Sequence, residues 1–154
     1  MKKILMAVIA VAVVAMAGAA MAADTAAVAV TANVVGTCQF DSDGSVAFGS
    51  LDPSLAPGTV TGTVGKPRFW CTKNANYTIT DDVGLHESGA IFRMQSAAVP
   101  TDFLPYTFAY TTTGTGAGKS APVDLTITAQ VDLNDTINIA AGGYTDTVTL
   151  SINP

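Results

Sequence analysis

The most regular stretch of this sequence is VDLTITAQV, residues 123–131, in which every second residue is apolar. Successive side chains of a β-strand point to opposite faces, so the apolar residues of this stretch share one face. They are Val123, Leu125, Ile127, Ala129 and Val131. The pattern predicts a strand with one face in a core and the other in water.

The same alternation recurs in other parts of the chain, at residues 28–34, 77–80, 104–110 and 147–152. Clusters of Gly, Pro, Asn and Asp separate these segments, and no stretch after residue 22 shows a helical apolar repeat. Seven or eight short antiparallel strands, each with one polar face, are typical of two packed sheets. We therefore predict an all-β, antiparallel β-sandwich.

The N-terminal residues have the features of a secretory signal peptide. Lys2 and Lys3 precede an apolar run from residue 4 to about residue 18, and Ala20-Met21-Ala22 offers a cleavage site. A membrane anchor is the competing interpretation, but the run falls short of the roughly 20 apolar residues that a span needs. We predict that residues 1–22 form a cleaved signal helix and that the exported chain does not insert in a membrane.

The charge of the exported chain limits its partners. Removing the leader leaves five basic residues against twelve acidic ones in 132 residues, a length that suits one domain. The few cations are scattered along the sequence, so the chain lacks the basic patch that nucleic acids or anionic lipids require. We expect no nucleic-acid partner.

The two cysteines, Cys38 and Cys71, are predicted to pair in an oxidising compartment. A metal site would need more ligands than two thiols and the distant His86, so we predict neither a metal nor a cofactor.

Three short motifs resemble functional sites only superficially. Residues 114–120 resemble a phosphate-binding loop, but Thr113 stands where that motif requires a Gly, and a strand rather than a helix follows. Residues 41–44 lack the later ligands of a calcium loop. His86-Glu87 has no nucleophile in a suitable setting. The sequence therefore predicts a protein that is not an enzyme.

Several motifs, in a fixed order, carry a resemblance to a known family. They are Val46-Ala47-Phe48-Gly49 with Leu51-Asp52-Pro53, Phe69-Trp70-Cys71-Thr72 with Tyr77-Thr78-Ile79, Arg93-Met94, Leu104-Pro105-Tyr106-Thr107-Phe108-Ala109-Tyr110, and Gly143-Tyr144-Thr145-Asp146-Thr147-Val148-Thr149-Leu150. With these elements the chain resembles the spore coat protein U domain family, which includes subunits of archaic chaperone–usher pili.

The resemblance implies an immunoglobulin-like sandwich that lacks its last strand. A donor strand from another subunit would complete it after a periplasmic chaperone has done so in transit, and an outer-membrane usher would assemble the fibre. Residues 23–35 would be the donor segment and residues 36–154 the sandwich domain. The chain would then be a structural subunit of a pilus or coat on the cell surface, in a polymer of one or several kinds of subunit.

The resemblance also assigns roles to particular residues. The donor side chains would be Ala26, Val28, Val30 and Ala32. The last strand, bordering the open groove, would contribute Val148, Leu150 and Ile152. Two alternatives stay open: residues 28–34 could be the first strand of a closed sandwich, and the protein could be a self-contained module that binds a glycan or another small ligand.

Overall fold

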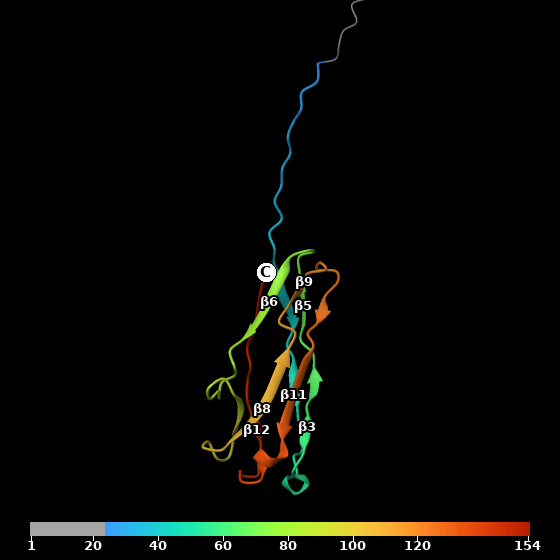
Figure 1. The fold of residues 1–154 in the computed structure, drawn as a ribbon. Coiled ribbons are helices and arrows are strands. Elements are labelled where there is room, and N and C mark those ends of the chain that lie inside the picture. Colours follow the sequence, from blue (N-terminus) through green and yellow to red (C-terminus); the bar gives the residue numbers. More distant parts are fainter. Residues whose placement is uncertain (1–23) are drawn as a thin grey trace, which may run out of the picture. The chain divides into compact units, whose positions relative to one another are not determined.

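The computed structural model describes residues 24–154 of the chain (Figure 1). The predicted signal peptide, residues 1–22, lies outside these residues. Residues 34–154 form one compact unit, called the body below. Residues 24–33 belong to a separate unit and contain no strand or helix, although their sequence alternates as a strand does.

The regular secondary structure of the body consists almost entirely of short strands. They are β1 (Cys38–Ser42), β2 (Ser45–Ala47), β3 (Thr59–Thr61), β4 (Thr63–Gly65), β5 (Arg68–Cys71), β6 (Asn76–Asp81), β7 (Phe92–Ser96), β8 (Phe103–Tyr110), β9 (Thr113–Thr115), β10 (Val123–Asp124), β11 (Ile127–Asp132), β12 (Tyr144–Thr145) and β13 (Leu150–Asn153). Two 3-10 turns, η1 (Pro53–Leu55) and η2 (Leu133–Thr136), interrupt the connections. The all-β prediction is confirmed.

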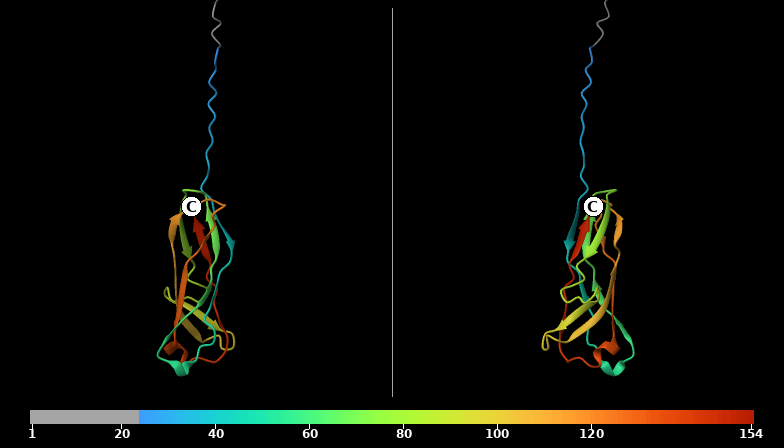
Figure 2. Two further views of the ribbon diagram at one scale, coloured as in Figure 1. Left: turned by 90° about the vertical axis from the view of Figure 1, so that its right-hand side faces the viewer. Right: turned by 60° about the vertical axis from the view of Figure 1, so that its left-hand side comes forward.

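The strands form antiparallel sheets in the orders β1-β5-β10, β13-β6-β9, β12-β7-β8-β11-β3 and β2-β4. The first two sheets pack against each other, and the ring of Phe69 on β5 meets that of Tyr77 on β6 edge-on, with centroids 5.1 Å apart. Figure 1 shows β8, β11 and β3 side by side, and in Figure 2 the strands run along the long direction of the body. The predicted antiparallel sandwich is therefore present.

The structure has more and shorter strands than the sequence predicted, because long segments change sheet along their length. Val123 on β10 pairs with Phe69 on β5, whereas Ile127 on β11 pairs with Tyr110 on β8. The alternation survives this change. Ile127, Ala129 and Val131 are all buried, and the polar residues between them are exposed. Val123, at the outer edge of its sheet, is the exception and is exposed.

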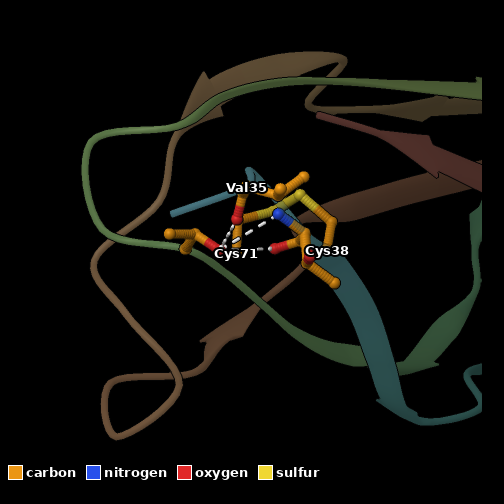
Figure 3. Close-up of a disulfide and its surroundings, with 5 residues drawn as sticks. Val35, Cys38 and Cys71 are labelled. Carbon is orange, nitrogen blue, oxygen red and sulfur yellow. Dashed lines mark hydrogen bonds between the residues drawn. A yellow bond between two sulfur atoms is a disulfide. The ribbon is translucent and has the colours of Figure 1, made fainter. Parts of the chain in front are cut away.

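A disulfide and several hydrogen bonds attach the first residues of the body to the end of β5. Cys38 and Cys71 form the predicted disulfide (Figure 3). Next to it, the Thr72 amide donates to the carbonyl oxygen of Thr37 at 2.8 Å, and the Thr37 amide donates to the Thr72 hydroxyl at 3.0 Å. The Thr72 hydroxyl also reaches the carbonyl oxygen of Val35 at 3.4 Å. These bonds fix where the folded body starts.

Candidate strand-binding groove

A groove runs along the body between two segments that are distant in sequence. One hollow of about 740 Å³ lies between residues 40–48 and residues 144–150. A second hollow of about 550 Å³ continues it between residues 46–51 and 139–144, and both hollows are lined by Val46, Phe48, Met94 and Tyr144. We call residues 40–51 the first wall of the groove and residues 139–150 the second wall.

The floor of the groove is apolar and only partly removed from water. It is formed by Met94 on β7, Leu104, Tyr106 and Phe108 on β8, and Ile127 on β11. Leu104 and Ile127 are buried, but Met94, Tyr106 and Phe108 are half-buried. Apolar surface left in contact with water favours any partner that covers it.

The first wall has an unpaired strand edge. Since Thr72 donates to Thr37, the hydrogen-bonded pairs between β1 and β5 are 37 with 72 and 39 with 70. The N–H and C=O groups of Cys38 and Phe40 therefore point away from β5. In residues 24–154, no strand pairs with that edge of β1, and β2 pairs only with β4.

The second wall has an unpaired edge too. The Asp82 amide donates to the carbonyl oxygen of Thr149 at 3.2 Å, which makes 151 with 80 and 153 with 78 the next hydrogen-bonded pairs of β13 and β6. The peptide groups of Leu150 and Ile152 therefore face away from β6. Within the part of the chain that the structure describes, β13 pairs with no strand other than β6, although β1 lies close to it.

The predicted site residues fall into two groups. Val148 and Leu150 line the groove, while Ile152 on β13 packs against the core cluster instead. The predicted donor residues lie in residues 24–33, where Val28 is 83% and Val30 89% exposed. No strand pairing involves residues 24–33. Their insertion into a neighbouring groove stays a prediction.

Residues 146–149 of the second wall lie between β12 and β13 and are held mainly by side chains. The Asp146 carboxylate accepts the Tyr106 hydroxyl at 2.7 Å through Oδ2 and the Leu85 amide at 3.0 Å through Oδ1. The Asp82 carboxylate accepts the Thr149 amide at 2.9 Å and the Gly84 amide at 3.0 Å. We call these four bonds the carboxylate latch.

The latch also affects proton binding at its groups. Burial, followed by the bond to Asp146, raises the pKa of Tyr106 above its ordinary value, so this hydroxyl stays a donor. The hydrogen bond from Thr149 lowers the pKa of Asp82, so its carboxylate stays charged. Sequence reasoning missed these residues as a unit. The available signals were the Asp81-Asp82 doublet and the Tyr144-Thr145-Asp146 motif.

The remaining chemistry of the body is sparse. Among residues 24–154, no group of three or more His, Cys, Asp or Glu side chains is placed to hold a metal ion. In the same residues, no helix is long and apolar enough to cross a membrane.

Two solved structures are similar to part of this chain. One similar solved structure is the CsuC–CsuE chaperone–tip adhesion subunit pre-assembly complex from the archaic chaperone–usher Csu pili of Acinetobacter baumannii, at 21% identity and a TM-score of 0.48. That match covers 77% of this chain and 40% of the other. A chaperone–tip adhesin complex of CFA/I fimbriae biogenesis matches at 14% identity and a TM-score of 0.39, over 76% of this chain and 41% of the other.

This chain therefore spans about two fifths of the length of these two solved chains. No protein of curated function matches the sequence. The family comparison is more extensive, because the Spore Coat Protein U domain matches residues 24–151, which include the four predicted donor residues and both walls of the groove. The chain belongs to the Spore Coat Protein U domain family.

Proposed function

We propose that this protein is a structural subunit of a surface pilus or coat and that it polymerises by donor-strand complementation. Residues 1–22 are the leader that directs export, residues 23–35 the donor segment, and residues 36–154 the domain that receives a donor. The side chains of Ala26, Val28, Val30 and Ala32 enter the groove of the next subunit.

The observation that carries this proposal is an apolar groove with an unpaired strand edge on each wall. A strand inserted between the walls gains main-chain hydrogen bonds from Phe40 on one side and from Leu150 on the other. Its inward side chains cover Met94, Tyr106 and Phe108. One inserted strand would then both pair the free backbone groups of the walls and cover the apolar floor.

The N-terminal segment has the properties of that occupant. Val28 and Val30 are almost fully exposed, and the family match begins at residue 24. Alternating side chains would place Ala26, Val28, Val30 and Ala32 on one face of an extended strand. These side chains are small, which suits a groove whose floor already carries large aromatic rings.

An open groove also explains the proposed partners. A long unpaired edge beside apolar surface promotes aggregation unless another chain covers it. A periplasmic chaperone occupies the groove during transit, and an outer-membrane usher exchanges the chaperone strand for a donor segment. Val148 and Leu150 contact whichever strand is present.

Deletion of residues 24–32 from the exported chain tests the proposal. The deleted chain keeps the groove but has no donor, so we expect it to accumulate as a chaperone-bound monomer. Mixed with the intact chain, it should add to one end of a polymer and stop growth there. Gel electrophoresis without heating, together with electron microscopy, measures both results. Fibres formed by the deleted chain alone would contradict the proposal.

A further inference from the structure

The second wall is interrupted where it borders the floor of the groove. β12 pairs with β7 through Tyr144 and Thr145, and β13 pairs with β6 from Leu150 onward. Residues 146–148 between them belong to neither ladder, and Thr149 joins β6 through one main-chain bond alone, that from the Asp82 amide. Their position depends on the carboxylate latch, which ties Asp146 to the floor residue Tyr106 and to the turn after β6.

That turn has a costly backbone conformation. Val83 has φ 62° and Gly84 has φ 85°, and a β-branched residue in the left-handed region is a rare outlier. Such strain persists only where surrounding contacts compensate for it, and it is a reason to look for a function. Here the amides of Val83, Gly84 and Leu85 donate in succession to Asp81, Asp82 and Asp146.

The turn and Asp146 also fit closely in space. A Cβ atom on Gly84 would collide with the Asp146 carboxylate, so residue 84 has to be glycine for two reasons, its positive φ and this contact. The strained backbone of the turn and the glycine at its centre thus both allow the turn to bond to Asp82 and Asp146.

The floor beside the latch would attract a free wall. Val148 is only half-buried and lines the same groove as the half-buried Phe48 and Phe108. If residues 146–149 were untethered, burial of this apolar surface would favour their collapse across the floor. A collapsed second wall would fill the place of an incoming strand.

We propose that Asp146 is a positioning residue for strand capture, which acts with Tyr106 and Asp82 to fix residues 146–149 at the edge of the floor so that the groove stays open. This inference rests on the proposed function, since it concerns the same groove. It assigns a role to Asp146 and to the glycine at position 84 that differs from contact with the donor strand.

The full exported chain is used for the test, refolded by dilution with a fluorescent peptide of residues 24–34. Fluorescence anisotropy gives the dissociation constant of the peptide. Because a hydrogen bond to a charged group is worth about a tenfold change in an equilibrium, we expect about tenfold weaker capture for Asp146→Ala and for Tyr106→Phe. Asp146→Asn keeps an acceptor for the Leu85 amide. Its dissociation constant for the peptide should lie between those of these variants and that of the unchanged chain.

Tyr110→Phe is the matched control. Tyr110 also lies on β8 and donates to a carboxylate, that of Asp81 at 2.6 Å. The Asp81 carboxylate accepts the Val83 amide of the turn, but it accepts no bond from residues 146–149 of the second wall. Its removal should leave peptide capture within about twofold while lowering thermal stability as Tyr106→Phe does. Hydrogen exchange at the Leu85 and Thr149 amides should accelerate in Tyr106→Phe and Asp146→Ala only.

The outcomes separate the two proposals. If the unchanged chain captures no peptide, donor-strand complementation is wrong and the positioning role falls with it. If the unchanged chain captures the peptide and Tyr106→Phe binds it as Tyr110→Phe does, the proposed function stands and the role of Asp146 is wrong. Equal hydrogen exchange at Leu85 and Thr149 in all variants would also overturn that role.

Discussion

The two sides of this sandwich are built from the same alternating pattern, but they differ in what covers them. On the closed side, Phe69, Ile79 and Val131 are at most 1% exposed. On the groove side, Phe48 and Val148 are apolar residues that line the groove, and both stay half-buried. The pattern specifies which face of a strand is apolar, and the topology decides whether the chain itself can cover that face.

The difference means that the closed side should determine whether the body folds, and the groove side whether it assembles. Substitutions on the two sides should therefore separate stability from polymerisation.

The largest effect is expected from a charge placed on the inward face of the donor segment. Val30→Asp would bring a carboxylate into an apolar groove, where an unpaired charge costs several kcal/mol, so polymerisation should stop. Thr31→Asp is the matched control, because neighbouring residues of a strand face opposite sides. It should assemble almost as the unchanged chain does, as measured by the ladder of multimers on unheated gels. Equal loss in both variants would show that the predicted inward face is wrong.

Loss of the disulfide should have the next largest effect, and it acts on the folding of the body. Cys38 and Cys71 are 33 residues apart, so the bond removes about 3–4 kcal/mol of chain entropy from the unfolded state. Replacing both with serine should lower the free energy of unfolding by about that amount, measured by denaturant titration. An unchanged unfolding midpoint would indicate that pairing of β1 with β5 suffices without the bond.

A pair of cavity-forming substitutions compares the two sides directly. Ile79→Ala removes a side chain that is 1% exposed and should cost about 2–5 kcal/mol in the free subunit. Val148→Ala removes a half-buried side chain and should cost about 1 kcal/mol or less there.

In the polymer the cost of Val148→Ala should rise toward that of Ile79→Ala, because the donor strand buries Val148 as well. Thermal unfolding of free and polymerised protein measures both costs. A Val148→Ala cost that is the same in the two states would mean that nothing packs on this part of the groove.

The sequence was informative where a structural feature depends on one segment or on the compartment. Alternation over residues 123–131 predicted the buried face of β11, and export predicted the bond between Cys38 and Cys71. It was less informative where segments meet. The change of sheet after Asp124 depends on which strands lie alongside, and alternation is the same on either sheet.

The groove was predicted through the family resemblance and not through the pattern. The apolar residues at 148 and 150 give the same sequence pattern whether this chain or a neighbouring chain covers them. The carboxylate latch was not predictable, because it joins Asp146 to Tyr106, 40 residues away, and to the Leu85 amide, which follows the unusual backbone of Val83 and Gly84.

The smallest expected effect is a pH dependence on the groove side. The hydrogen bond from Thr149 lowers the pKa of Asp82 below its ordinary value of 3.8, so the folded chain binds this proton less readily than the unfolded chain. The carboxylate therefore stabilises the fold above the ordinary pKa, and the contribution is lost as the pH falls through the lowered pKa. The thermal unfolding midpoint of Asp82→Asn should lie below that of the unchanged chain near neutral pH, and the gap should close in acid.

Asp52→Asn provides the matched control for this measurement. The pKa of Asp52 is also lowered, by the bond from the Ser54 amide in η1, but Asp52 takes no part in the carboxylate latch. Both substitutions should therefore reduce the fall of the thermal unfolding midpoint in acid. Only Asp82→Asn should weaken capture of the peptide of residues 24–34 near neutral pH, because only Asp82 fixes Thr149 in the second wall. Equal peptide capture by the two variants would mean that Asp82 stabilises the body without shaping the groove.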